Sequence, residues 1–554
     1  MAIYGIDLGT TFSSAAFVRH GVSEVVALEA GRPVLPSPVL FDGSNGGLQV
    51  VVGSPALRRY RALVGEAERA PHDVVLVRGS KNNIGHAEQS LAGPPWRLGE
   101  REVTPTDVAA ILLRSVGDMI RARPGLPPID GVVVTHPQRF RNREKLATAQ
   151  AAQLAGLPLV GMLTEPDAAA WAYGLHSNRV SDASASGQFM VFDFGGGTLD
   201  VTLMRRDADR GDGRRRVQAI DSYGVQLGGL AIDRTIRDQL VAQYASVTGD
   251  RGFNLAAVNE ATAERLLELA EWFKIALNTD AGADPQPLSR VRKKSFTPVF
   301  DASAEGETVT LEVTLGDLSR WLSGELDRAI GCAEEALKRA SLRWSDIDEV
   351  LLTGGSSLLW PLQQRMRERC QRVRLFDDPR HPLNPLTIVA SGAALYGASL
   401  ETPSASAVSV QGVVPDAFSV RAFEPDASAP GGRRAVLVAL VKAGTPTPFV
   451  GHAAFTWRGH GLTLPVEIFE GRDSREATSI GVYQLSFDRP IADGARVDVR
   501  LDVRANGALR VSVEDRQSGT LREAQLDDAP GLYADTVMRE KSAWLQSLSP
   551  QWEG

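Results

Sequence analysis

The chain has little cysteine, no long apolar run and no excess of positive charge. Of its 554 residues only Cys332 and Cys370 are cysteines, and neither lies in a CxxC motif or a Cys/His cluster, which is typical of a reducing compartment. No apolar run reaches the ~18 residues that span a bilayer, and the first residues form no basic-then-apolar leader. We therefore expect a cytoplasmic protein with no membrane partner.

Charge and length narrow the function classes further. The net charge of −7 argues against a general nucleic-acid-binding surface. The basic residues between 210 and 216 are interpreted as solvated loop charges, so we expect no nucleic-acid partner. A chain of 554 residues exceeds what one hydrophobic core supports, and roughly two to four domains are expected.

The order of secondary-structure signals predicts four segments. Strand-like and helix-like patterns alternate over residues 1–400, as in an α/β architecture. Residues 401–412 are rich in Thr, Pro, Ser, Ala and Val and are predicted to be a linker. Short alternating strands separated by Gly, Pro and Asp turns then predict an all-β sandwich over residues 413–527. Residues 528–554 remain as a short C-terminal tail.

Two glycine-rich hairpins, far apart in the chain, carry the strongest chemical signal. In each, an apolar strand delivers an aspartate, small residues turn the backbone and a second apolar strand follows: residues 4–18 contain Asp7, and residues 192–202 contain Asp193. Main-chain N–H groups at such turns can cradle phosphate oxygens, whereas a carboxylate beside phosphate requires a bridging cation such as Mg²⁺. One such hairpin could be an ordinary tight turn. Its occurrence twice favours a nucleotide held from two sides.

A third glycine turn supports the same interpretation. Residues 350–357 follow another apolar strand and precede a helix-like stretch, which lets the backbone pass close to the sugar and base of a nucleotide. Three such turns predict one cleft between two lobes.

These motifs resemble those of the seventy-kilodalton heat-shock (DnaK-like) chaperones, whose ATPase is related to actin and the sugar kinases. Residues 81–85 (KNNIG) are similar to the family's lysine segment, and residues 132–137 (VVVTHP) to its proline-bearing strand. The most specific string is the glutamate–proline helix at 165–174 (EPDAAAWAYG), which actin and sugar kinases do not normally carry whole. The resemblance implies an actin-like two-lobed ATPase followed by a β-sandwich substrate-binding domain.

The resemblance also assigns roles to residues. Asp7 and Asp193 would position Mg²⁺ through its waters, and Lys81 would place a positive charge near the γ-phosphate or the attacking water. Glu165, Asp193 and Thr198 would complete the catalytic set. ATP or ADP would be held by Gly9, Thr10, Thr11, Phe12, Gly195, Gly196, Gly197, Gly228, Gly229, Glu271, Lys274, Asn278, Gly354, Gly355 and Ser356.

Several of these residues have a purely structural alternative. A lysine before Asn-Asn is more often solvated than catalytic, so Lys81 depends on its Lys-x-x-Ile-Gly context. Glu165 could simply end a loop that enters a helix, since Pro166 suits a first helical turn. Pro137 could be a rigid corner, although it resembles the family's proline switch with Lys145 near the place of its arginine partner.

The chain also departs from the family pattern. Ile275 and Leu358 stand where most members hold adenine between two arginines, and each loss removes about 1 kcal/mol of stacking. The acidic-flanked leucine linker is replaced by residues 408–416. Gly161 stands where many bacterial members carry an arginine used by J-domain partners, which argues against activation by an ordinary J-domain protein.

The tail is short. Fewer than thirty residues follow Leu526, which as one helix would reach only ~40 Å, too little for the family's multi-helix lid. We expect Trp544, Leu545, Leu548 and Trp552 to form an amphipathic turn that packs on the sandwich.

Two functions follow from these features. The favoured one is an ATP-dependent chaperone that binds unfolded or extended polypeptides, with a nucleotide-exchange factor or a J-domain protein as possible partners. The alternative is a nucleotide-switched module that binds one dedicated protein with slow turnover. A sugar kinase is disfavoured because it has no need for the C-terminal β domain.

Overall fold

The computed structural model describes most of the chain. The described residues are 1–44, 47–65, 73–86, 96–99, 101–176, 186–207, 215–250, 252–256, 258–279, 281–301, 304–376, 378, 381, 383–401, 408–429, 432–459, 461–471, 475–504, 509–525 and 533–553.

The first lobe, lobe I, is built on a mixed sheet with the strand order β11-β10-β1-β2-β3, in which β4 also pairs with β2. β10 is parallel to β1 and β11, whereas β2 is antiparallel to β1. β10 is buried along its whole length, as expected for a parallel strand covered on both faces. The strands are β1 (Ile3–Asp7), β2 (Phe12–Arg19), β3 (Val22–Val25), β4 (Val34–Pro36), β10 (Gly131–His136) and β11 (Leu159–Thr164).

Two long helices and two smaller sheets complete lobe I. Helices α2 (Pro105–Ala122) and α3 (Asn142–Leu154) pack against each other. α2 begins after a capping box of Thr104 and Asp107, with proline in its first turn. The remaining elements are α1 (Ser54–Gly65), the sheet β6-β5-β7 of β5 (Val39–Asp42), β6 (Gln49–Val52) and β7 (Val74–Val77), and the pair β8 (Trp96–Leu98) and β9 (Arg101–Val103).

The second lobe, lobe II, repeats this plan. Its sheet has the order β20-β19-β12-β13-β14-β21, with β19 parallel to β12 and β13 antiparallel to β12. The strands are β12 (Gly187–Phe194), β13 (Leu199–Arg206), β14 (Arg215–Val225), β19 (Glu349–Thr353), β20 (Val373–Arg374) and β21 (Val408–Gln411). Around them lie α5 (Gly229–Thr248), α6 (Glu260–Asn278), α7 (Leu315–Trp321), α8 (Ser323–Arg339) and α9 (Trp360–Arg367), and the strand pairs β15 (Val291–Phe296) with β18 (Val309–Thr314) and β16 (Val299–Asp301) with β17 (Ala304–Glu305).

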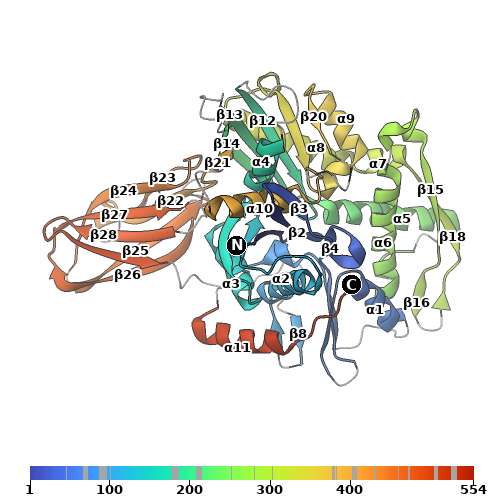
Figure 1. Ribbon diagram of the computed structural model, residues 1–554, viewed down its shortest axis with the longest axis horizontal. Helices are drawn as coiled ribbons and strands as arrows, with labels where there is room; N and C mark the ends of the chain where they lie inside the picture. Colours follow the sequence, from blue (N-terminus) through green and yellow to red (C-terminus); the bar gives the residue numbers. More distant parts are fainter. Residues whose placement is uncertain are drawn as a thin grey trace.

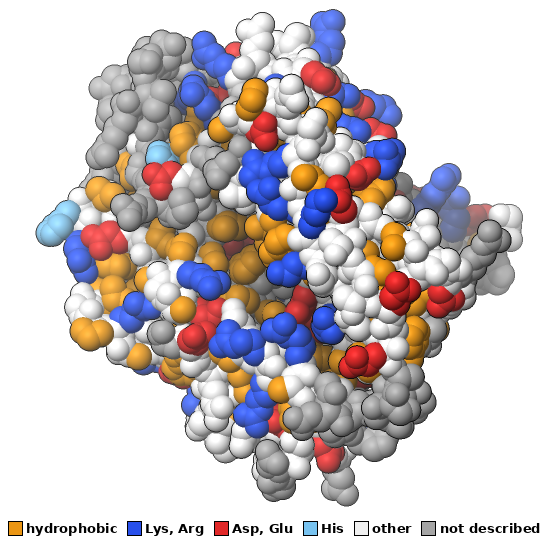
Figure 2. Space-filling model, turned by 90° about the vertical axis from the view of Figure 1, so that its right-hand side faces the viewer, with side chains coloured by type: hydrophobic (Ala, Val, Ile, Leu, Met, Phe, Trp, Pro, Cys, Tyr) orange, Lys and Arg blue, Asp and Glu red, His pale blue; other side chains and the backbone are white. Residues whose placement is uncertain are grey.

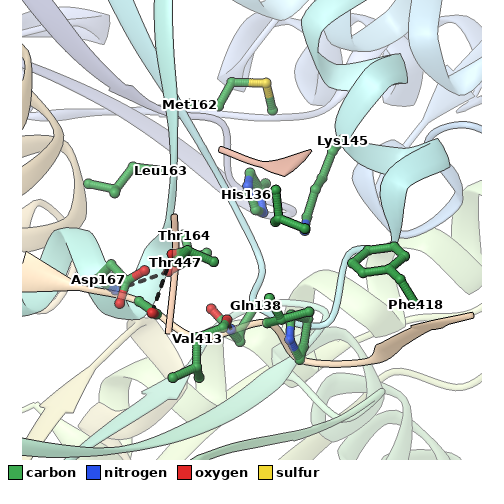
Figure 3. Close-up of a pocket in the computed structure, with 14 residues that line it drawn as sticks. His136, Gln138, Lys145, Met162, Leu163, Thr164, Asp167, Val413, Phe418 and Thr447 are labelled. Atoms are coloured by element: carbon green, nitrogen blue, oxygen red, sulfur yellow. Dashed lines mark hydrogen bonds between the residues drawn. The ribbon is translucent and has the colours of Figure 1, made fainter. Parts of the chain in front are cut away.

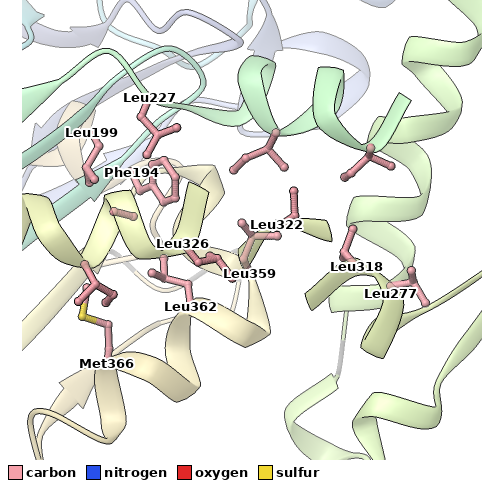
Figure 4. Close-up of a cluster of buried hydrophobic side chains, with 14 of the residues drawn as sticks. Phe194, Leu199, Leu227, Leu277, Leu318, Leu322, Leu326, Leu359, Leu362 and Met366 are labelled. Carbon is pink, nitrogen blue, oxygen red and sulfur yellow. The ribbon is translucent and has the colours of Figure 1, made fainter. Parts of the chain in front are cut away.

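The hydrophobic core of lobe II supports the second glycine hairpin. Phe194 and Leu199, on either side of the turn, are fully buried. Figure 4 shows them in one cluster with Leu326 of α8 and Leu362 of α9. The hairpin turn therefore stands on a packed base.

Helices α4 (Glu165–His176) and α10 (Ile388–Glu401) lie between the two sheets (Figure 1). They touch closely, because a Cβ on Gly392 would lie 1.7 Å from the carbonyl oxygen of Ala168. α10 is equally close to β1, where a Cβ on Gly5 would lie 2.2 Å from the amide nitrogen of Ala394. Glycine at these two positions brings the lobes together on a shared helical layer.

The strand-rich C-terminal region consists of two four-stranded antiparallel sheets, β23-β22-β25-β26 and β24-β27-β28-β29, which share one hydrophobic cluster. Strand β28 alternates buried and half-buried side chains along its length, the period-2 pattern of a strand with one face in a core. We call this region the sandwich. Its strands are β22 (Ala417–Pro425), β23 (Arg433–Val441), β24 (Phe449–Thr456), β25 (Gly461–Gly471), β26 (Thr478–Ile491), β27 (Arg496–Val503), β28 (Leu509–Asp515) and β29 (Thr520–Gln525).

The predicted linker takes part in the lobe II sheet. Residues 402–407 lie outside the described residues, but β21 pairs in parallel with β14, in the register Arg215 to Val408 through Gln218 to Gln411. The sandwich is therefore joined to lobe II through a strand of the lobe's own sheet.

The expectation for the tail was wrong. Helix α11 (Asp535–Ser547) packs on α2 and α3 of lobe I and lies away from the sandwich (Figure 1). Met538, Leu545 and Leu548 are buried in the lobe I core instead. An amphipathic helix takes whichever apolar surface is free, and here α2 and α3 provide it. No helix within the described ranges is long and apolar enough to cross a bilayer.

Candidate active site

A cleft of ≈ 260 Å³ lies between the two lobes and collects both glycine hairpins and the third glycine turn. Figure 2 shows the face of the molecule that carries α1, α5 and α6, with a hollow lined by apolar side chains and bordered by lysines and arginines. The cleft is lined by Asp7, Gly9, Thr10, Thr11, Phe12, Lys81, Glu165, Asp193, Gly195, Gly196, Thr198, Gly229, Glu271, Lys274, Ile275, Gly354, Gly355, Ser356, Leu358, Pro385, Leu386 and Val389.

The turns of the two hairpins meet at the centre of the cleft. A Cβ on Gly196 would lie 1.8 Å from Oγ1 of Thr11, so the lobe II turn reaches the lobe I turn only as glycine. The second turn is held by a hydrogen bond from the Gly195 N–H to the Thr198 carbonyl at 2.9 Å. Ser356 donates to the Gly195 carbonyl at 2.8 Å and ties the third glycine turn to the second hairpin.

Three of the predicted nucleotide-contacting residues do not line the cleft. A Cβ on Gly228 would lie 2.5 Å from backbone atoms of Gly196, and one on Gly197 would lie 2.1 Å from Oδ1 of Asn82. These two glycines therefore allow close packing behind the turn. Asn278 accepts from the Trp360 N–H at 2.7 Å and donates to the Lys274 carbonyl at 2.6 Å, so its amide is engaged in holding α9 against α6.

The end of the cleft beside the two hairpin turns contains more acidic than basic side chains. Lys81, from a 3₁₀ turn, and Glu165, at the start of α4, form a buried ion pair. Burial alone would lower the pKa of Lys81, but the carboxylates of Glu165 and Asp7 outweigh it and raise that pKa. Asp193 and Asp200 are also buried, which leaves four carboxylates around one lysine.

The pKa values of these carboxyl groups are raised mainly by burial and further by neighbouring carboxylates. Burial raises the pKa of Asp7 to about 7. Burial and the neighbouring Glu165 raise the pKa of Asp200 to about 7, and burial with the same neighbour raises that of Asp193 well above its usual value. The buried carboxylate oxygens of Asp200 and Oγ1 of Thr11 have no hydrogen-bond partner among the described residues. The donor set therefore suits a hydrated cation, and no group of three or more His, Cys, Asp or Glu within the described part of the chain is arranged to bind a metal directly.

The opposite end of the cleft is largely apolar. Ile275 of α6 and Leu358 face the cleft together with Pro385, Leu386 and Val389. The last three were missed by sequence reasoning, because they follow no glycine motif and reach the cleft only through the packing of α10. Lys274 is the cation at this end, and its Nζ lies 2.6 Å from Asp233.

Comparisons with known proteins agree with this site. The Hsp70 protein family model matches residues 3–543. Chaperone protein DnaK from two strains of Thermus thermophilus is 30% identical over 97% of this chain and 82% of the relative. Chaperone protein dnaK3 of Synechococcus elongatus is 30% identical over 97% of this chain and 68% of the relative. A match of this extent implies nucleotide binding in an actin-like ATPase joined to a β-sandwich, and the chain belongs to the Hsp70 family of ATP-dependent chaperones.

Proposed function

We propose that Mg²⁺-ATP binding and hydrolysis in the cleft control the binding and release of extended, apolar polypeptide by the sandwich. The observation that carries this proposal is the strand order β12-β13-β14-β21 in lobe II. The phosphate hairpin is β12–β13, and the strand that leads to the sandwich is β21. A change at the phosphates therefore reaches the sandwich through three consecutive strand pairings.

The residue roles follow from charge. Asp7 and Asp193 would hold a hydrated Mg²⁺, which would supply positive charge beside the carboxylates of the cleft and the triphosphate. Lys81 weakens its ion pair with Glu165 and contacts the γ-phosphate. Glu165 and Thr198 then orient the attacking water. Hydrolysis of this kind depends on positioning and on electrostatic stabilisation.

The sandwich also contacts lobe I directly, at the loop between β10 and α3. Gln138 donates to the carbonyl of Val413 at 3.1 Å, and Arg141 donates to Thr478 at 3.1 Å. The N–H of Asn142, the first residue of α3, donates to the buried carboxylate of Glu470 at 2.9 Å. We call these contacts the joint. Because the sandwich touches lobe I at the joint and lobe II at β21, its attachment depends on the angle between the lobes.

A small enclosed pocket of ≈ 40 Å³ lies at the joint. Figure 3 shows His136, Lys145 and Asp167 around it, with Val413 and Phe418 from the sandwich side. Burial raises the pKa of Asp167 to about 6 and lowers that of His136 to about 3. Separating a buried, polar joint of this kind costs little free energy, because its charged and polar groups regain contact with water. That balance suits a contact that forms and breaks in a cycle.

The proposed client is recognised by apolar contact. Phe423, Leu462 and Val482 of the sandwich expose half or more of their side chains. DnaK-like chaperones also act with co-chaperones, and we extend this to a nucleotide-exchange factor for the present chain. Cys332 and Cys370 are both buried and form no disulfide bond with each other, in keeping with a cytoplasmic location.

Peptide release tests the proposal. A fluorescent apolar peptide bound to the purified chain is expected to dissociate faster after addition of Mg²⁺-ATP than after Mg²⁺-ADP. Equal dissociation rates would reject nucleotide control of the sandwich. The matched control is Asp193→Asn, in which the difference between the nucleotides should shrink while binding of peptide to the nucleotide-free protein is unchanged.

A further inference from the structure

The C-terminal segment 533–553, which we call the strap, begins at a buried polar cluster on lobe I. The hydroxyl of Tyr533 donates to Asp107 at 3.0 Å, and Lys541 of α11 forms an ion pair with the same carboxylate. Asp107 has no exposed side-chain surface. Gln150 of α3 bonds both backbone groups of Tyr533, at 2.9 and 3.1 Å. The carboxylate that caps α2 thus also fixes the strap.

The middle of the strap is part of the hydrophobic core. Leu545 is 2% exposed and lies in the same cluster as the apolar side chains of α2. The guanidinium of Arg114, also on α2, donates to the Leu545 carbonyl. Arg101 stacks on the ring of Trp544 at 4.8 Å. These contacts resemble the interior of a domain more than a transient surface contact.

The end of the strap joins a different part of lobe I. The N–H of Gln551 donates to the Val50 carbonyl at 2.9 Å, and the Val52 N–H donates to the Gln551 carbonyl at 2.8 Å. Residue 551 therefore extends the sheet β6-β5-β7 by a parallel bridge. Glu553 pairs with Arg58 of α1 at 2.9 Å. The strap thus spans lobe I from α2 and α3 to the small sheet.

We propose that the strap stays on lobe I in every nucleotide state. It would thereby tether the sandwich at the end of β29, from which the chain leads to Tyr533. The sandwich then has two kinds of attachment. The joint and the pairing of β21 can release, whereas the strap cannot. Residues 526–532 connect Gln525 of β29 to Tyr533, and eight residue steps reach at most ~28 Å when extended. Once released from the joint, the sandwich could move only as far as keeps Gln525 within that distance of Tyr533. This inference rests on the proposed release of the joint by nucleotide.

Hydrogen exchange on the full chain tests the permanence of the strap. Amides of α11 are expected to be equally protected in Mg²⁺-ATP and Mg²⁺-ADP, within about twofold, and loss of protection in either state overturns the proposal. The exchange rates of the β21 amides test the proposed function separately. If these rates are equal in both nucleotide states, the proposed function fails, whereas the permanence of the strap still depends on the α11 amides. The two failures are therefore distinguishable.

Distances between spin labels test the tether. Labels at Gln153→Cys on α3 and Leu521→Cys on β29 are expected to stay at a limited separation in both ATP and ADP, because Gln525 cannot lie more than ~28 Å from Tyr533. Tyr533→Phe with Lys541→Met should broaden the distance distribution in the nucleotide state in which the joint is released, whereas Glu540→Gln, an exposed residue of α11, should not. A distribution already as broad in the unaltered strap as in the double variant would overturn the tether.

Discussion

The cleft and the joint both bury ionisable side chains, but they leave them in different balance. In the cleft, Asp193 and Asp200 are buried and Asp7 is half-buried, and these carboxyl groups outnumber the cation Lys81 beside them. At the joint, Glu470 is closed off by another part of the chain and is held by one backbone N–H of α3. The difference teaches that the cleft gains by adding a cation, whereas the joint loses little by separating, because its groups regain water. Cation binding and sandwich release are therefore different responses to buried charge.

The largest expected effect comes from the cleft. Asp193→Asn keeps the size of the side chain but removes one of the charges that hold the cation, and we expect ATP turnover to fall about 10²–10³-fold. Steady-state hydrolysis at saturating Mg²⁺-ATP measures this. Asp238→Asn, on the exposed side of α5, is the matched control and should leave turnover unchanged. Equal turnover in both variants would show that Asp193 does not serve the reaction.

The joint is expected to respond to pH. Burial raises the pKa of Glu470 to about 7, with Asp416 and Glu144 also raising it and Lys145 and the Asn142 N–H lowering it. Because the pKa in the docked state lies above the ordinary value of 4.5, docking is favoured at low pH, and this advantage is lost as pH rises from about 4.5 to about 7. The change is on the order of 3 kcal/mol at most.

Glu470→Gln separates this contribution from the rest of the joint. A glutamine can still accept from the Asn142 N–H but does not ionise, so docking should lose most of its dependence on pH between 5 and 7.5. Protection of β21 amides against exchange, followed as a function of pH, measures it. Thr478→Ser, which keeps the hydroxyl that accepts from Arg141, is the control and should retain the wild-type profile. A wild-type profile that is flat, or that rises with pH, would contradict the argument.

The residues of the cleft could be predicted from the sequence better than the packing of the C-terminal tail, for a physical reason. The glycine hairpins are local patterns, so residues as far apart as Thr11 and Gly196 could be assigned to one cleft, where they now lie in contact. The tail carried only an amphipathic pattern, which gives the apolar face of a helix but not the surface that will cover it. Asn278 was assigned to the nucleotide from its place on α6, but the start of α9 takes up its amide. Such choices depend on tertiary neighbours that a local pattern does not contain.

A smaller effect is expected where the segment that follows β7 meets α6 across the cleft. Arg78 of lobe I forms an ion pair with Glu264 of lobe II and lies 3.9 Å from Glu268. Burial raises the pKa of Glu264, and Arg78 opposes that rise. Arg78→Ala removes the partner of Glu264, whereas Glu268 keeps its ion pair with Arg61 at 3.0 Å. The loss costs about 1–2 kcal/mol in the closed form, so ADP should dissociate about 5–30 times faster. Stopped-flow release of a fluorescent ADP measures it. Arg292→Ala, on β15 of lobe II, is the control, and equal release from both variants would exclude Arg78 as an interlobe contact.

The smallest effect is expected at the apolar end of the cleft. Ile275 is 53% exposed and lines this end beside Leu358. Ile275→Arg would place a guanidinium plane over the base and add about 1 kcal/mol of stacking, or roughly fivefold tighter ATP binding. Ile275→Gln is the matched control, because it lengthens the side chain without adding charge. Isothermal titration calorimetry measures the affinity of both variants for ATP and for GTP. If the two variants bind ATP equally tightly, the base does not lie against this face of α6. The assignment of the two ends of the cleft would then have to be reversed.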